Sequence, residues 1–190
     1  MNKYLKPCLF SALTLVACNS YAALITGTIQ YVGISAPTGG TSLADATGLS
    51  FPNSVGNEGT ILIKDGLLAT LITDNIIDLY DFAFDPLASG GSMVWNDTES
   101  GISFLLTDVT LIDQSSSFLN LSGSGVLTGG DYEDTIAKWD LSTQSVDNNG
   151  GATITFSAST STANIPEPAS LGILGLGLIG LGFVRKQKKS

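Results

Sequence analysis

The chain contains no histidine, and this absence removes several kinds of functional site. Histidine is the usual general base at neutral pH, the base of Ser-His-Asp triads and a common metal ligand. The two cysteines, Cys8 and Cys18, both lie in the first 22 residues, so removal of that segment leaves no thiol for a disulfide or a thiolate metal site. We therefore expect that the protein binds no cofactor and is not an enzyme. Paired carboxylates, as in glycoside hydrolysis, are the catalytic chemistry that remains to consider.

Positive charge is scarce as well. Between Ala23 and Asn164 the basic residues are Lys64 and Lys138, against sixteen of the chain's 17 acidic residues, which gives this region a net charge of −14. Such a surface repels nucleic acid and disfavours anionic lipid, so we expect no nucleic-acid partner. Two interpretations of the excess acid stay open: it keeps the region in solution, or it accumulates divalent cations.

The first 22 residues have the pattern of a secretory signal. Two lysines precede a short apolar run from Cys8 to Ala17, and Ala22 ends a small-x-small cleavage site. This pattern predicts a signal peptide helix over residues 1–22, cleaved between Ala22 and Ala23. A competing interpretation is a lipobox at residues 15–18, in which Cys18 would be lipidated.

The middle of the chain reads as strands rather than helices. Trp139 and Leu141 share one face of an alternating run, which predicts that Trp139 is a core residue. Asp65-Gly66 signals a hairpin, and residues 38–57 look like a long loop. We expect an all-β fold with a single antiparallel, jelly-roll-like β-sandwich over residues 23–156, followed by a polar linker over residues 157–164. The expected strands are 24–32, 60–64, 67–73, 76–84, 93–96, 102–107, 118–122, 126–128, 138–143 and 153–158.

Several acidic and aromatic residues are candidates for chemistry. Asp131, Glu133 and Asp134 follow a Gly-Gly turn and are weak candidates for a calcium site, but a plain acidic turn is the favoured interpretation, and we expect no metal. Trp95 could stack on a sugar ring if it were exposed. The further candidates are Asp74, Asp78 and Asp81 for calcium, Asp81 and Asp85 with the acids above for a carboxylate pair, and Tyr80 and Tyr132 for stacking.

Residues 165–190 combine three features in a fixed order. Pro166, Glu167 and Pro168 form a stiff extended peptide, because each proline fixes φ and lacks an N–H. The uncharged run from Ala169 to Val184 is just long enough for a transmembrane helix. The basic tail over 185–189 then keeps the C-terminus cytoplasmic. A proline-rich helix stop ahead of an ordinary anchor is the plainer interpretation. The basic residues are Arg185, Lys186, Lys188 and Lys189.

This order resembles the PEP-CTERM sorting signal, also known as the ice-binding protein C-terminal domain. The resemblance covers residues 165–189 and implies a substrate of exosortase, a membrane-embedded cysteine protease of Gram-negative bacteria. It implies that Pro166, Glu167 and Pro168 are recognition residues rather than catalytic ones. The ice-binding name implies nothing about residues 23–164.

Together these patterns predict an exported cell-surface or extracellular protein with a single-pass inner-membrane intermediate whose C-terminus is cytoplasmic. We expect exosortase, the inner membrane and exopolysaccharide as partners. The predicted role is a non-catalytic structural component of an exopolysaccharide or biofilm matrix. The alternative is a lectin-like module that binds carbohydrate or calcium.

Overall fold

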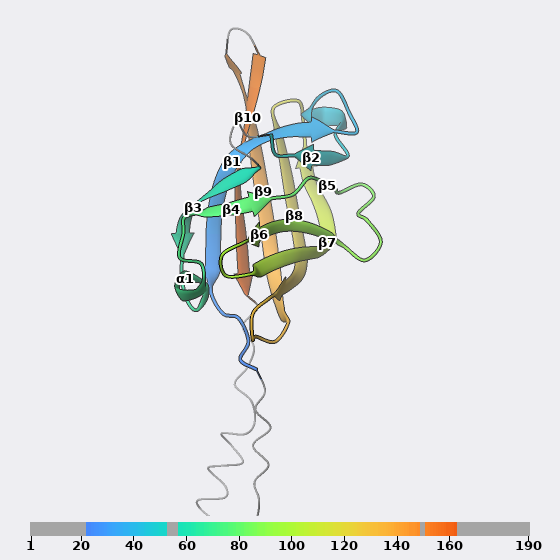
Figure 1. The fold of residues 1–190 in the computed structure, drawn as a ribbon. Helices are drawn as coiled ribbons and strands as arrows, with labels where there is room; N and C mark the ends of the chain where they lie inside the picture. Colours follow the sequence, from blue (N-terminus) through green and yellow to red (C-terminus); the bar gives the residue numbers. More distant parts are fainter. Residues whose placement is uncertain (1–21, 53–56, 149–150, 163–190) are drawn as a thin grey trace, which may run out of the picture.

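The structure, a computed structural model, describes residues 22–52, 57–148 and 151–162. Within these residues the chain is almost entirely β-strand, with one short α-helix and one 3-10 turn (Figure 1). The elements are β1 (Thr28–Thr38), η1 (Leu43–Asp45), β2 (Gly48–Ser50), β3 (Glu58–Lys64), α1 (Leu68–Leu71), β4 (Ile76–Leu79), β5 (Phe82–Ala83), β6 (Ser92–Asp97), β7 (Ile102–Gln114), β8 (Phe118–Thr128), β9 (Thr135–Asn148) and β10 (Gly151–Thr162).

Eight of these strands close into an antiparallel barrel. Its order is β1-β3-β4-β6-β7-β8-β9-β10, and β10 pairs again with β1. Each strand after β1 therefore lies beside the strand before it in this series, as in an up-and-down meander, and β10 returns to pair with β1. The closing ladder pairs Thr28 with Ser161 and continues to Ser35 with Ile154. Closure leaves the barrel strands without a free edge along this ladder.

The remaining two strands form a small annex above the end of β1. Ala36 to Thr38 pair with β2, and β2 pairs with β5. The Gln114 side-chain amide at the end of β7 donates to the carbonyl oxygens of Leu43 (2.6 Å) and Ala46 (2.9 Å), which attaches η1 to the barrel. Donors from Thr41 and Ser42 lower the pKa of the Asp45 carboxyl below its usual range and hold this turn together.

The predicted jelly-roll-like sandwich is wrong, although the all-β class is right. A sandwich and a barrel both bury alternate residues of short strands, so the local pattern is the same for the two. The difference lies in the pairing of β1 with β10, which joins residues more than a hundred positions apart. Alternation within a strand carries no information about that partner.

The prediction around Asp65-Gly66 is also wrong in part. Gly66 makes a turn, but residues 67–73 do not return as a strand, because Leu68 and Ile72 are both fully buried and lie one helical turn apart. The ammonium of Lys64 donates to the carbonyl oxygens of Ile72 (2.9 Å), Thr73 (3.0 Å) and Asp74 (2.9 Å). These bonds satisfy the backbone acceptors that directly follow α1.

Two other expected segments differ in extent. The polar linker was expected from residue 157, but β10 continues to Thr162, with Ser157, Ser159 and Ser161 on the outer face and Ala158 and Thr160 buried. The expected loop over 38–57 contains η1 and β2. In both places a polar composition was mistaken for irregular structure, because a strand with one solvent-exposed face can have the composition of a linker.

The two helices expected at the ends are not described. Residues 1–21 of the signal peptide and residues 169–184 of the predicted transmembrane helix lie outside the described ranges. In the part of the chain that is described, no helix has the length and apolar character that a bilayer crossing requires.

A hydrogen-bonded set of large side chains fills the barrel. Trp139 donates its indole N–H to the Tyr31 hydroxyl (2.8 Å), and Trp95 donates to the Thr160 hydroxyl (3.0 Å). Tyr31 and Thr160 are hydrogen-bonded to one another, and burial raises the pKa of the Tyr31 hydroxyl. Phe104 stacks on Trp95. All five side chains are at most 1% exposed, so the interior is a packed core joining β1, β6, β7, β9 and β10.

Replacement of Thr160 by valine tests this buried network. Thr160→Val keeps the side-chain volume but leaves the Trp95 N–H without its acceptor, so we expect a loss of about 1–3 kcal/mol in the free energy of unfolding. Guanidinium denaturation of the purified protein measures this loss. The control is Thr155→Val on the exposed face of the same strand, expected within about 0.5 kcal/mol of the parent. Equal stability of the two variants would contradict the network.

Replacement of Gly125 tests the close approach of β8 to β7. A Cβ at Gly125 would lie 2.2 Å from the Leu105 carbonyl oxygen and 2.7 Å from the Phe104 ring. Gly125→Ala should therefore destabilise the protein by about 1–3 kcal/mol, measured by the shift of the denaturation midpoint. Ser124→Ala, the outward neighbour, serves as control and should change stability little. A neutral Gly125→Ala variant would show that the two strands are not this close.

Candidate functional site

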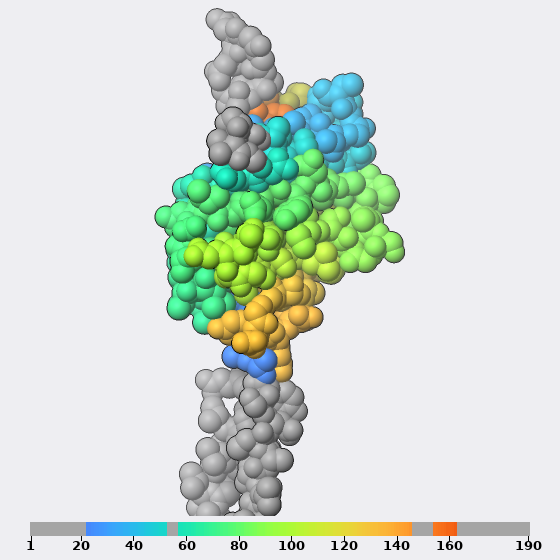
Figure 2. All heavy atoms as spheres, viewed as in Figure 1, coloured from blue at the N-terminus to red at the C-terminus, as the bar shows by residue number. Residues whose placement is uncertain are grey.

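The acids predicted as weak calcium ligands lie where the body begins. The β8–β9 connection carries Asp131, Glu133 and Asp134, and the Glu133 N–H donates to the Ala23 carbonyl oxygen (3.1 Å). Figure 2 shows this connection (orange) against the first described residues (blue) at one end of the molecule. Among the described residues, no group of three or more acidic, cysteine or histidine side chains is arranged to hold a metal ion.

The predicted cleavage site, Ala22 and Ala23, lies at this same end. Ala23 is exposed, whereas Ile25 is fully buried and donates its N–H to the Thr135 hydroxyl (2.9 Å). The last described residue is close by, because the Thr162 N–H donates to the Gly27 carbonyl oxygen (3.0 Å). Both ends of the described body therefore leave the barrel at one pole.

The acids considered for catalysis have other contacts. Asp81 accepts the N–H of Phe51 (2.9 Å) and so supports the annex. Asp85 precedes a cis proline and is exposed. Neither belongs to the connection that carries Asp131, Glu133 and Asp134, so the geometry does not gather the five candidates at one place.

A separate hollow of about 410 Å³ is acidic, and it includes Asp74 and Asp78 from the predicted calcium candidates. Its carboxylates accept hydrogen bonds from nearby hydroxyls: Asp78 from Thr98 (2.5 Å) and Glu99 from Thr73 (2.8 Å). Asp97, 4% exposed, accepts from the Ser100 N–H (3.0 Å) and hydroxyl. These bonds fix the turns at the ends of β4 and β6, which is the acidic-turn interpretation.

The aromatic candidates for sugar stacking divide clearly. Trp139 is fully buried, as predicted, and Trp95 is fully buried too. Tyr132 packs partly against the core, and Tyr80 is 40% exposed. The tryptophans therefore present no ring face to a ligand, since the packed interior covers both.

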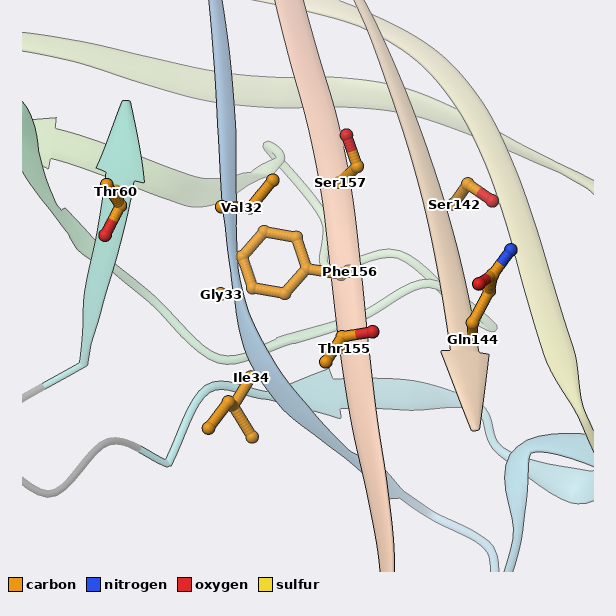
Figure 3. A pocket seen from close by; sticks show the side chains of 9 residues that line it. All are labelled: Val32, Gly33, Ile34, Thr60, Ser142, Gln144, Thr155, Phe156 and Ser157. Atoms are coloured by element: carbon orange, nitrogen blue, oxygen red, sulfur yellow. The ribbon is translucent and has the colours of Figure 1, made fainter. Parts of the chain in front are cut away.

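Three hollows on the outer face of the barrel meet at one residue, Ser142 of β9. Their volumes are about 570, 490 and 500 Å³. In Figure 3 the first hollow has Val32 and Ile34 of β1 on one side and Ser142 and Gln144 of β9 on the other, with β10 between them. We call the joined surface the Ser142 trough. Its polar floor consists of Asn120, Ser122, Asp140, Ser142, Gln144, Thr155, Ser157 and Ser159.

Strand register aligns this floor into rows. Asn120 pairs with Ser142 and Ser142 with Ser157, and the next row pairs Ser122 with Asp140 and Asp140 with Ser159. Within rows, the Ser142 hydroxyl donates to the Asn120 amide oxygen (2.8 Å) and the Ser122 hydroxyl donates to Asp140 (2.7 Å). None of these floor residues was predicted as a site from the sequence, because only the register of three strands brings them together.

The sorting residues predicted from the sequence, Pro166 to Pro168 and the basic residues 185–189, lie outside the described residues. A family model described as the PEP-CTERM protein-sorting motif matches residues 164–186. No curated protein and no solved structure matches the chain significantly. The match confirms the resemblance drawn from the tail: the chain carries a PEP-CTERM sorting motif, which implies an exported protein whose C-terminal signal is processed by the membrane protein exosortase.

Proposed function

We propose that this protein is a non-catalytic structural component of an exopolysaccharide or biofilm matrix. The observation that carries the proposal is the Ser142 trough on a body that is exported through its sorting motif. The packed tryptophans and Tyr31 fill the barrel, so contacts with other matrix components fall to the outer surface. Hydroxyl and amide side chains both donate and accept hydrogen bonds, as the hydroxyls of polysaccharides do.

The proposed route passes through the inner membrane. The apolar run from Ala169 to Val184 would enter the bilayer after export of the body, and the basic tail over 185–189 would hold the C-terminus in the cytoplasm. Exosortase would then act at Pro166, Glu167 and Pro168. The position of Thr162 at the pole where the body also begins supports this route, because the barrel is complete before the motif starts.

A non-catalytic role is supported by the acids that were candidates for glycoside hydrolysis. Two carboxyl groups must flank one bond for that reaction. Asp81 instead accepts the backbone N–H of Phe51, and neither Asp81 nor Asp85 belongs to the β8–β9 connection that carries Asp131, Glu133 and Asp134.

The alternative is a lectin-like module with a discrete carbohydrate or calcium site. The trough favours the carbohydrate form of this alternative, because its floor holds mostly neutral donors and acceptors. A glycan array with and without EDTA separates the two proposals: calcium-dependent selective binding supports the lectin, and the absence of calcium-dependent selective binding supports the matrix component.

Mutation of the motif tests the sorting route. Glu167→Ala combined with Pro168→Ala should leave a longer product retained in the membrane, because the extended recognition peptide is lost. Immunoblots of cell fractions and the intact mass of the protein measure it. Asp108→Ala, which removes an exposed carboxylate of β7, is the control and should be processed normally. Normal release of the double variant would refute the route.

Enzymatic dissolution of the matrix tests the proposed role. We expect the protein in isolated extracellular matrix, and we expect polysaccharide-degrading enzymes to release it together with sugar while buffer alone does not. Immunoblots of the released fraction measure this. Absence of the protein from the matrix, or its retention after the polysaccharide has dissolved, would overturn the structural role.

A further inference from the structure

The Ser142 trough crosses the outer faces of β8, β9 and β10, with β7 at one end and β1 at the other. One of its hollows is lined by Ile112 of β7 and Gln30 of β1, while small side chains of β8, β9 and β10 lie between them. The closing ladder of the barrel brings Gln30 beside Ser159, so this part of the Ser142 trough exists only because β1 and β10 pair. Ile112 is 62% exposed and forms a raised wall.

The trough is neutral apart from two carboxylates, Asp140 in the floor and Asp113 at the third hollow. Serine hydroxyls and the asparagine amide supply both donors and acceptors. The Ser142–Asn120 and Ser122–Asp140 hydrogen bonds already orient the side chains that they join. Side chains held in place before binding lose less conformational entropy when a ligand arrives. The rows lie across neighbouring strands, which are about 4.8 Å apart, a spacing similar to the size of one sugar ring.

The walls supply apolar contact as well. Val32 and Ile34 of β1 lie beside Ser157 and Thr155 of β10 in the lining of the first hollow (Figure 3), and Ile34 is 47% exposed. A pyranose ring presents C–H groups on its faces and hydroxyls at its edge, so a surface with both kinds of lining suits it. Peptide segments would instead seek a free strand edge, and the strands of the trough are paired on both sides.

Charge selects among polysaccharides. The region from Ala23 to Asn164 has a net charge of −14, and Asp140 lies in the trough floor. Lys64 is engaged by three carbonyl oxygens, and Lys138 lies on β9 opposite Ser124 and Ser161, outside the three hollows. A uronate or sulfated chain would meet repulsion with no cation in the floor to offset it.

We propose that the Ser142 trough binds an uncharged polysaccharide chain laid over β8, β9 and β10. This inference rests on the proposed matrix role and deepens it by naming the class of polysaccharide and the residues that contact it. Ser142 is the central contact, since all three hollows share it. Binding of a neutral chain should change little with ionic strength, because no ion pairs form.

The test uses the exported protein and matched neutral and charged probes. The neutral probes are dextran, hydroxyethylcellulose and galactomannan, and the anionic probes are dextran sulfate, alginate and polygalacturonate. Affinity electrophoresis and calorimetry measure binding at low and high salt. We expect the protein to bind at least one neutral probe with the same affinity at both salt concentrations. We expect no anionic probe to be bound with an affinity that stays the same at both salt concentrations.

Two variants locate the binding. Ser142→Gln fills the centre of the trough and should weaken binding to the neutral probe about tenfold or more. Ser124→Gln makes the same change on the outward face of β8, outside the three hollows, and should bind as the parent does. Both positions face outward, so both variants should keep the parent's thermal midpoint, which is measured alongside.

Each other result counts against the inference. Binding of anionic probes alone, or of no probe, would overturn the neutral class. Neutral binding that Ser142→Gln leaves unchanged would overturn the site. If the protein is nevertheless released from the matrix with dissolved polysaccharide, the matrix role stands and only the trough is wrong; if it is absent from the matrix, the role itself fails whatever the probes show.

Discussion

The pairing of β1 with β10 is the constraint on which the rest of the structure depends. It joins eight consecutive residues of each strand and closes the barrel. Closure brings Tyr31 of β1 within hydrogen-bonding reach of Thr160 and Trp139, so that two indole N–H groups find acceptors inside an otherwise apolar core. An unpaired N–H buried there would destabilise the fold, and these bonds therefore help to define which strands meet.

The same closure creates the outer surface. Inward positions of β8, β9 and β10 carry the core, while the alternate positions carry small hydroxyl and amide side chains. In β8, Gly123 and Gly125 permit a close approach to β7, where a Cβ would collide with backbone oxygens. The trough and the packed interior are thus two faces of one set of strands.

The sequence was sufficient for some levels of this structure and insufficient for others. Alternation predicted the all-β class and the burial of Trp139, because a strand with one dry face shows its period locally. It missed the continuity of β8, since the two glycines look like a break, and it missed α1, where Leu68 and Ile72 read as part of a strand.

Long-range relations were the part that local patterns could not supply. The sandwich was inferred instead of the barrel because nothing near Thr28 or Ser161 identifies its partner. The trough was not predicted for the same reason: Asn120, Ser142 and Ser157 are ordinary polar residues until register sets them in one row. The tail differs, since its features are contiguous in the sequence and a family model for the sorting motif matches residues 164–186 directly.

The position of Thr162 has a mechanical consequence. β10 is paired with β9 from Gly151 to Thr162 and with β1 from Ile154 to Ser161. Tension applied at this end would load two ladders in shear, so many hydrogen bonds would have to yield together rather than peel away one by one. A body held by its C-terminal end against flow would therefore resist being pulled open at its point of attachment.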